Sequence, residues 1–365
     1  MELDPSSVVR SLARRAGTAV VVAALAAAPV LAQEAAAAKV DTTPRKLFRS
    51  QEVVTMTITV DLKKLVRMRE RQSAPLPATL IYDAGAQGKD TMLISVGTRG
   101  NFRLQGRNCA FPPIRLFFSK AEIKGSIFEH QKDLKLVTRC QHEEEYEQYI
   151  LQEEPIYRIY NMLTPVSMRT RLVRVTYADS LKKEKPVTTY AFLVEDSDDV
   201  ARRIGGKPFS AKRAVWDDVD GRLMKVIGVM EFMIANTDWS LGALHNMKLV
   251  RAADNFSVLP MAYDFDWSGV INPRYATPDP SLPIRNVRQR LYRGPCIKDA
   301  NEMAEIAKEF TSRKAAIYAL YDKQPGLSPK VIKETKEYFD EFFVILASPR
   351  KVNDEMMSSC QELGN

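Results

Sequence analysis

The sequence predicts an α+β fold in two lobes, with a β-rich first half and a mainly helical second half. Two observations carry this prediction. Short segments rich in β-branched residues, some with alternating apolar and polar side chains, recur between residues 53 and 194. After residue 220, apolar residues recur mostly at helical spacing. Strands that come first and helices that come last are typical of α+β proteins.

Length and composition are those of an ordinary globular protein. The 365 residues suffice for two or three average domains or for one large domain of two lobes. Hydrophobic residues make up 45% and charged residues 27%, so a sizeable core can be buried. The 53 Lys and Arg against 45 Asp and Glu give a net charge of +8, spread along the chain. Without a dense basic tract, we expect no nucleic-acid partner.

The first residues read as a secretory signal. Arg10, Arg14 and Arg15 precede a short apolar run at 17–32 that is rich in Ala and Val. A basic start, a short apolar core and a small final residue predict a signal peptide over 1–32. The run is short for a membrane span, although an uncleaved anchor is the alternative. We therefore expect export to the periplasm, the cell envelope or the outside, with no stable membrane span after cleavage.

The remaining chain divides into a spacer and one folded domain. Residues 33–45 begin with an Ala-rich stretch and read as a linker. The folded domain is expected over 46–365, with its first lobe at about 46–195 and its second at about 196–365. No internal repeat is visible in it.

Four cysteines bear on the compartment and on metal binding. In an oxidising compartment they can form up to two disulfides, in any of three pairings. Free buried cysteines are the alternative. None belongs to a C-x-x-C motif and the chain has only three histidines, so we expect no zinc site. The cysteines are Cys109, Cys140, Cys296 and Cys360.

Individual elements follow from local patterns. We expect Pro155 to bend or restart the helix that contains it. β-branched and alternating residues predict strands at 53–62, 79–82, 92–96, 112–118, 134–137, 172–177, 189–194, 247–250 and 257–261. Apolar residues at helical spacing predict helices at 146–163, 221–235, 301–321 and 330–346.

Two short stretches hold most of the candidate chemistry. Residues 236–246 (NTDWSLGALHN) follow the helix at 221–235, and 263–267 (YDFDW) follow the last predicted strand. A hairpin between them would bring Asp238, Asn246 and Asp264 to one end of a small sheet. Mg²⁺ prefers oxygen ligands and usually takes one or two carboxylates plus phosphate oxygens. Taken alone, Asp238 equally fits a polar turn after a helix.

The order of these motifs resembles the CotH family, the atypical protein kinases of spore coats. The Asn-Thr-Asp-Trp segment, a later Asn, a hairpin and Asp-Phe-Asp are similar to the family's catalytic core. The similarity covers roughly residues 50–300. Further segments fall in the family's order: GTRGN at 97–101, a core strand at 132–136, YAFLVE at 190–195, a helix and glycine turn at 198–206, and a short strand near Lys212.

The resemblance implies a two-lobed, atypical protein-kinase-like fold and roles for individual residues. Asp238 would be the catalytic aspartate, which accepts or orients the proton of an acceptor hydroxyl. Asn246 and Asp264 would bind Mg²⁺ or Mn²⁺. Lys135 would contact the α and β phosphates of ATP, with Glu153 as its ion partner.

Arg99, in the glycine-containing turn, would contact a phosphate by the same resemblance. One departure concerns the catalytic loop. Kinase-like families commonly place the metal-binding asparagine five residues after the catalytic aspartate, whereas Asp238 and Asn246 are eight apart. Residues 241–243 look like an insertion of three residues, in which Gly242 permits a bulge. Because catalysis is sensitive to displacements of about 1 Å, the departure bears on activity more than on fold.

Several neighbours of these motifs have ordinary structural interpretations. We expect His245 to be a packing residue, and Trp239 and Trp267 to anchor the core. Residues 285–293 (RNVRQRLYR) predict a surface helix with a charged face. The alternative is a binding site for a phosphate or an acidic substrate.

Two functions from different classes remain open. The first is a Mg-dependent phosphotransferase that moves the γ-phosphoryl group of ATP to Ser or Thr of a protein. The second is a non-catalytic, kinase-like binding module of the cell envelope. Export favours the second because little ATP is present outside the cytoplasm. The cluster of metal-type ligands favours the first.

Overall fold

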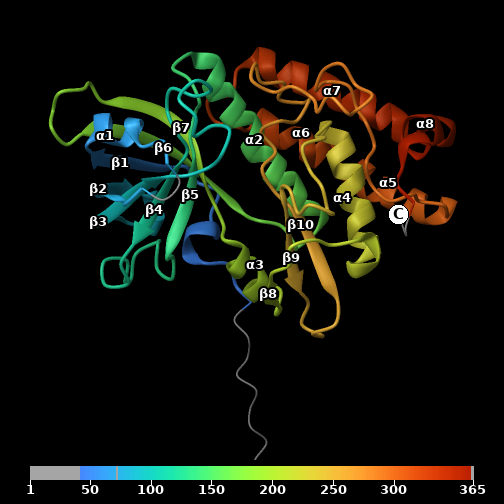
Figure 1. The fold of residues 1–365 in the computed structure, drawn as a ribbon, viewed down its shortest axis with the longest axis horizontal. Coiled ribbons are helices and arrows are strands. Elements are labelled where there is room, and N and C mark those ends of the chain that lie inside the picture. Colours follow the sequence, from blue (N-terminus) through green and yellow to red (C-terminus); the bar gives the residue numbers. More distant parts are fainter. Residues whose placement is uncertain (1–41, 71–72, 363–365) are drawn as a thin grey trace, which may run out of the picture. The chain divides into compact units, whose positions relative to one another are not determined.

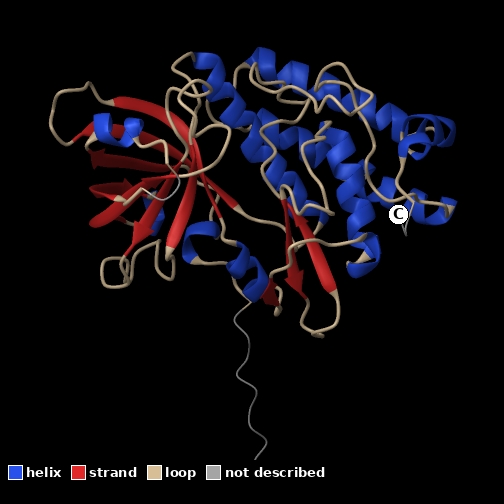
Figure 2. Cartoon of the chain, in the orientation of Figure 1, coloured by secondary structure: helices blue, strands red, loops and turns tan. Residues whose placement is uncertain are grey.

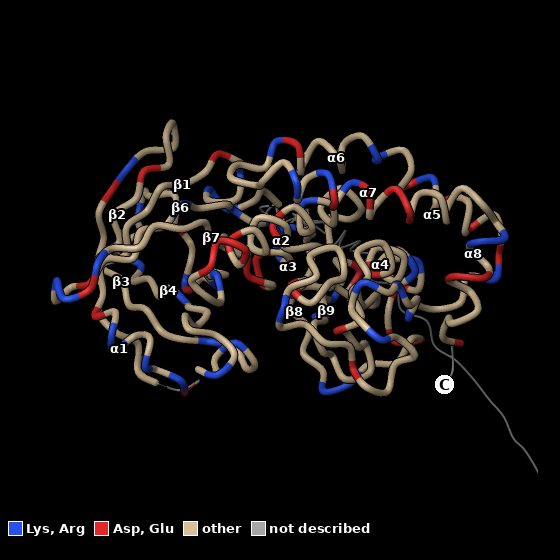
Figure 3. The backbone as a smooth tube through the Cα atoms, turned by 90° about the horizontal axis from the view of Figure 1, so that it is seen from above, with Lys and Arg blue, Asp and Glu red and all other residues tan. Residues whose placement is uncertain are grey.

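The computed structural model describes residues 42–70 and 73–362, and the structural statements below concern these residues. The expected signal peptide at 1–32 and most of the spacer at 33–45 lie outside them. The described residues belong to one compact unit. Strands dominate its first half and helices its second half, which confirms the predicted α+β class (Figures 1 and 2). Basic and acidic residues are interspersed along the chain (Figure 3).

The first half forms a closed barrel of seven strands. Neighbouring strands are antiparallel, except that β1 pairs with β6 in parallel and so closes the barrel. Closure leaves no strand edge unpaired. Every strand was predicted from the sequence, but the closure was not. Around the barrel the order is β1 (Val54–Val60), β2 (Leu76–Asp83), β3 (Lys89–Thr98), β4 (Ile114–Phe118), β5 (Asp133–Val137), β7 (Val187–Val194) and β6 (Thr170–Asp179).

Alternating side chains fill the barrel. On β1, Met56, Ile58 and Val60 are buried, while Thr55 is exposed between Val54 and Met56. The apolar side of each strand therefore faces the interior. Short elements flank the strands: a 3₁₀ turn η1 (Lys46–Phe48) precedes β1, the helix α1 (Leu62–Arg67) follows β1, and a 3₁₀ turn η2 (Gly85–Gln87) follows β2.

The helix α2 (Glu144–Leu163) connects the barrel to the helical half. It contacts β6 and β7 on one side and α6 (Lys314–Asp322) on the other. The helix continues through Pro155, so it does not restart there as the sequence suggested. Residues 149–157 are all buried, which places even Glu153 and Glu154 inside the protein.

The second half combines a small sheet with helices. The sheet has the order β10 (Val258–Ala262), β9 (Met247–Arg251), β8 (Lys207–Phe209), as the predicted hairpin requires. The other elements are α3 (Ser197–Arg203), η3 (Trp216–Asp218), α4 (Gly221–Ile234), α5 (Ala300–Thr311), α7 (Pro329–Leu346), α8 (Pro349–Glu355) and η4 (Met357–Ser359).

Three local predictions in this half were wrong. The helix expected at 301–321 is divided into α5 and α6 at Ser312 and Arg313, where the Arg313 side chain donates to the carbonyl oxygens of Met162 and Glu309. The short strand expected near Lys212 ends earlier, at Phe209. Residues 285–293 form an irregular segment rather than a surface helix.

The four cysteines form two disulfides, Cys109–Cys140 and Cys296–Cys360. This resolves the pairing that the sequence left open. Disulfides persist in oxidising compartments and are rare in the cytosol, so both bonds agree with the expected export. In the described part of the chain, none of the helices is both long and apolar enough to cross a membrane.

Candidate functional site

The loop after α4 is shaped by its first residues. Ala235 ends the helix in the left-handed region, with φ of 52°. The Asn236 side chain then accepts a hydrogen bond from the backbone N–H of Asp238 at 3.0 Å. The sequence left open that Asp238 only makes a polar turn after the helix. In the structure Asn236 makes this turn. The Asp238 carboxylate is left to make other contacts.

Two side chains hold the Asp238 carboxylate. Its Oδ1 lies 2.9 Å from His245 Nε2, and its Oδ2 accepts a hydrogen bond from Asn246 Nδ2 at 3.0 Å. The same Asn246 amide donates to the Asp238 carbonyl oxygen at 2.7 Å. Burial raises the pKa of Asp238, and the negative charge of Asp264 adds to the rise. Asp238 and Asn246 are thus brought together across the eight-residue spacing.

The three extra residues fold back on themselves. Ser240 and His245 exchange two backbone hydrogen bonds of 3.0 Å, which closes the loop between them. The backbone N–H of Ala243 donates to Ser240 Oγ at 3.2 Å. Residues 241–243 are therefore accommodated within the closed loop without separating Asp238 from Asn246. His245, expected only to pack, is half exposed and contacts the candidate catalytic carboxylate.

Asp264 follows β10 and lies beside the Asp238 loop. The register of β9 and β10 continues one step beyond the strands, where the N–H of Tyr263 donates to the Asn246 carbonyl oxygen at 3.1 Å. Asp264 has φ of 67° and its N–H donates to the hydroxyl of Tyr157 on α2 at 2.9 Å. The buried Phe265 ring lies 4.8 Å from the Tyr157 ring, so the sheet and α2 both position Asp264.

Cationic side chains from the barrel approach Asp264. Lys135 on β5 has its Nζ 5.0 Å from the centre of the Tyr263 ring. Burial and, after it, the charge of Arg99 lower the pKa of Lys135 to about 8, although the charge of Asp264 opposes the shift. Arg99 follows β3, and burial also lowers its pKa, opposed mainly by Asp264. Both cations therefore lie within the field of the candidate metal-binding carboxylate.

Glu153 is placed differently from the expectation. It lies on α2, almost fully buried, and its Oε1 has no hydrogen-bond partner among the described residues. Burial and the charges of Asp266 and Asp264 raise its pKa well above the usual range. The cations that act on it are Arg103 and Arg99. Within the described ranges, no ion pair joins Glu153 to Lys135.

Three further residues of this cluster had no role predicted from the sequence. Arg103 forms an ion pair with Asp266 at 3.7 Å, and the hydroxyl of Tyr275 donates to Asp266 at 3.0 Å. Burial and repulsion from Asp264 raise the pKa of Asp266 to about 7. The only sequence signals were the second carboxylate of Asp-Phe-Asp and a basic residue just after the GTRGN segment.

The donor set fits a divalent cation shared with phosphate. Nδ2 of Asn246 is used by Asp238, so its Oδ1 and the Asp264 carboxylate are the oxygens left for a metal ion. Across residues 42–70 and 73–362, no three His, Cys, Asp or Glu side chains gather as the ligands of one metal ion. A magnesium site of one carboxylate, one amide and phosphate oxygens is of the kind that Mg²⁺ favours.

A groove of about 400 Å³ opens beside Asp238. Trp267, His245 and the proline-rich segment 277–282 line it. Arg293 also lines it, and its guanidinium donates to the carbonyl oxygens of Thr237 and Trp239. Asp238 itself belongs to the lining of this groove.

Comparisons with known proteins add little. No protein-family model matches the chain, and no curated protein matches it. Among solved structures, the proinflammatory kinase CtkA of Helicobacter pylori matches with a TM-score of 0.36 and 9% sequence identity. The match covers 68% of this chain and 92% of that one. A TM-score of this size does not establish a shared fold, so any functional assignment depends on the site itself.

Proposed function

We propose that this protein is an exported, Mg-dependent phosphotransferase that transfers the γ-phosphoryl group of ATP to Ser or Thr of a protein. One observation carries the proposal: the Asp238 carboxylate is held by Asn246 and His245 despite the three extra residues. A catalytic aspartate and a metal-binding asparagine must be neighbours in such a site. The barrel with Lys135 and the helical half with Asp238 would form the two lobes of a CotH-like, atypical kinase fold.

Each group has a defined task in this proposal. Lys135 and Arg99 would neutralise phosphate charge from the barrel side. Asn246 Oδ1 and Asp264 would hold Mg²⁺ or Mn²⁺, which supplies charge neutralisation between the β and γ phosphates when bound. Asp238 would orient the acceptor hydroxyl and accept its proton. His245 would keep the carboxylate in that orientation.

Nucleotide binding is the first test. Thermal stability of the purified protein would be measured with ATP, with and without Mg²⁺ or Mn²⁺. We expect a metal-dependent stabilisation that disappears in Asp264→Ala and persists in Asp217→Asn, which removes an exposed carboxylate elsewhere. The absence of stabilisation by any combination of nucleotide and metal would contradict the proposal.

Phosphoryl transfer is the second test. Transfer of labelled γ-phosphate to the protein itself or to added protein would be followed for Asp238→Asn and His245→Gln. General-base catalysis contributes on the order of a hundredfold or more, so Asp238→Asn should lose transfer but keep metal-dependent ATP binding. His245→Gln retains a donor and should slow transfer far less than His245→Ala.

A non-catalytic binding module of the cell envelope is the second candidate function. The two disulfides favour it, because compartments that preserve disulfides hold little ATP. Metal-dependent nucleotide binding without transfer, equal in the wild type and in Asp238→Asn, would favour this function over the enzyme.

A further inference from the structure

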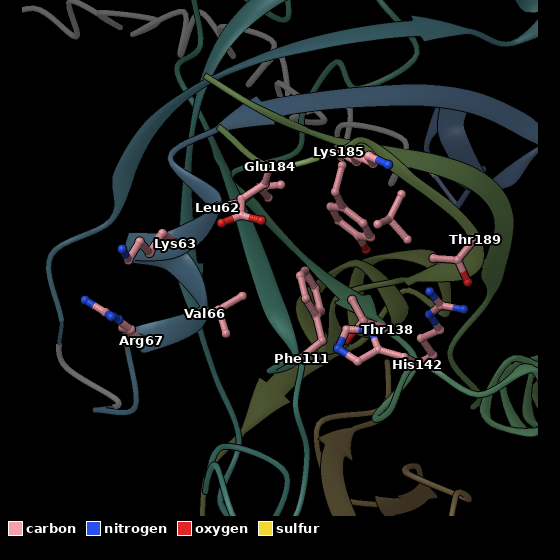
Figure 4. A pocket seen from close by; sticks show the side chains of 13 residues that line it. Leu62, Lys63, Val66, Arg67, Phe111, Thr138, His142, Glu184, Lys185 and Thr189 are labelled. Carbon is pink, nitrogen blue, oxygen red and sulfur yellow. The ribbon is translucent and has the colours of Figure 1, made fainter. Parts of the chain in front are cut away.

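A second cavity lies at one end of the barrel, away from the candidate phosphotransfer site. Its volume is about 320 Å³, and none of the site residues discussed above lines it. Its walls come from α1, from the β6–β7 hairpin and from the segments on either side of the Cys109–Cys140 disulfide. Figure 4 shows Val66 on one side, Thr189 on the other, and the Phe111 ring standing between them.

The cavity is apolar along most of its walls. Leu62, Val66, Phe111 and Val187 contribute aliphatic and aromatic surface. The Phe111 ring packs against Tyr177, with 4.7 Å between the ring centres. At roughly 30 Å³ per carbon-sized group, the volume accommodates a single chain on the order of ten carbon atoms.

One region of the wall carries two polar groups without protein partners. Tyr177 is only 3% exposed, and its buried hydroxyl forms no hydrogen bond with any described residue. A buried hydroxyl without a partner is costly, so such a group commonly marks the place of a ligand atom or water. Arg139 also lines the cavity, and its guanidinium takes part in no ion pair or hydrogen bond within the described ranges. Arg139 is close enough for its charge to act on the Tyr177 hydroxyl.

The charged side chains that line the cavity favour a negatively charged ligand. Lys63, Arg67, Arg139 and Lys185 line the cavity, against a single carboxylate, Glu184. In Figure 4, the Lys63 and Arg67 side chains extend from α1 away from Phe111. Arg139 is the cation whose charge acts on the Tyr177 hydroxyl. A carboxylate head group would pair with Arg139 and accept a hydrogen bond from the tyrosine hydroxyl.

We propose that this cavity binds a single-chain, medium-length aliphatic carboxylate, with its head group on Arg139 and Tyr177 and its chain along Leu62, Val66, Phe111 and Val187. The volume is too small for the two acyl chains of a phospholipid, which is why the proposed ligand has a single chain. The proposal is independent of phosphotransferase activity, because it concerns different residues.

Calorimetric titration of the intact protein with hexanoate, octanoate and decanoate tests the proposal. Burial of each added CH₂ should tighten binding about fourfold until the cavity is full. An alkyl trimethylammonium of matched length should not bind. The absence of saturable binding by every acid, or equal binding of the cationic amphiphile, would overturn the proposal.

Variants locate the binding site. Arg139→Gln should weaken decanoate binding about tenfold or more, since a hydrogen-bonded charge is lost. Arg174→Gln removes the same charge from an exposed position on β6 and should leave binding unchanged. Val187→Trp fills the cavity from a half-exposed position and should abolish binding without unfolding the barrel. Equal effects of Arg139→Gln and Arg174→Gln, or sedimentation with anionic phospholipid vesicles that decanoate does not compete, would contradict the assignment.

Discussion

At the scale of residues, the candidate catalytic loop lies over a buried carboxyl group. Glu231, in the last turn of α4, is 1% exposed, and the Asn236 side chain is the polar group that acts most strongly on its carboxyl group. Its carbonyl oxygen accepts the N–H of Asn236 at 2.8 Å, which begins the turn before Asp238. Burial raises the pKa of Glu231 to about 8. Glu231 therefore supports this loop through its backbone, while burial favours the neutral form of its carboxyl group.

This raised pKa predicts how stability depends on pH. A carboxyl group with a usual pKa of 4.5 in the unfolded chain and about 8 in the folded protein binds its proton more tightly when folded. Its contribution is fully present below pH 4.5 and is lost as the pH rises through about 8. Glu231→Gln keeps the shape without the titration. We expect the melting temperature of the wild type to fall relative to this variant as the pH rises through that window.

Thermal melts of both proteins across that range measure the difference. Other buried acids, such as Glu154, titrate in both proteins and cancel in the comparison. A difference in melting temperature that stays constant from pH 4.5 to 8 would show that Glu231 does not titrate as its burial implies.

At the scale of elements, the inserted loop at 241–243 has its own anchor. Leu241 is 2% exposed and packs into the core of the helical half. Gly242, expected to permit a bulge, does not adopt a positive φ, and a Cβ there would meet only Ser240 Oγ at 3.9 Å. The left-handed positions are Leu244 and Asn246 instead.

These contacts predict that two neighbouring substitutions change the free energy of unfolding by different amounts. Leu241→Ala should lower the free energy of unfolding by about 2–4 kcal/mol, because it empties a buried position. Gly242→Ala should change it by less than about 0.5 kcal/mol, since the position is open and unstrained. Denaturant unfolding of the three proteins measures both values. Equal destabilisation by the two variants would show that the loop is held by its backbone alone.

The sequence predicted elements better than their pairing. β-branched residues marked each barrel strand, because strand formation leaves a local pattern. The closure pairs Val54 with Val173, and no local pattern encodes a contact across so many residues.

At the candidate site, too, local patterns did not predict contacts between distant segments. The motifs identified Asp238, Asn246 and Asp264, which local loops bring together, whereas the surroundings of Glu153 depend on α2 packing beside Arg103 and Asp266.

At the scale of the whole molecule, the two disulfides constrain different regions, one in the barrel and one in the helical half. Cys109–Cys140 connects the segment after β3, which carries Arg99 and Arg103, to the end of β5, which carries Lys135. Cys296–Cys360 joins the segment before α5 to the end of the helical half. The first bond therefore orders the cations expected to meet phosphate, and the second orders a region that lies near Arg293 of the groove but carries none of those cations.

This difference predicts separate effects on stability and on binding. The bonds span 31 and 64 residues, so replacing either cysteine pair by serine should cost about 4 kcal/mol of stability by the chain-entropy argument. Only Cys109→Ser/Cys140→Ser should also weaken metal-dependent ATP binding, measured well below the melting temperature of both variants. Cys296→Ser/Cys360→Ser is the matched control. If both pairs weaken nucleotide binding equally, the cations on β3 and β5 do not need the first disulfide. If only the first pair does, the proposed phosphate site requires an oxidising compartment, which joins the site to the expected export.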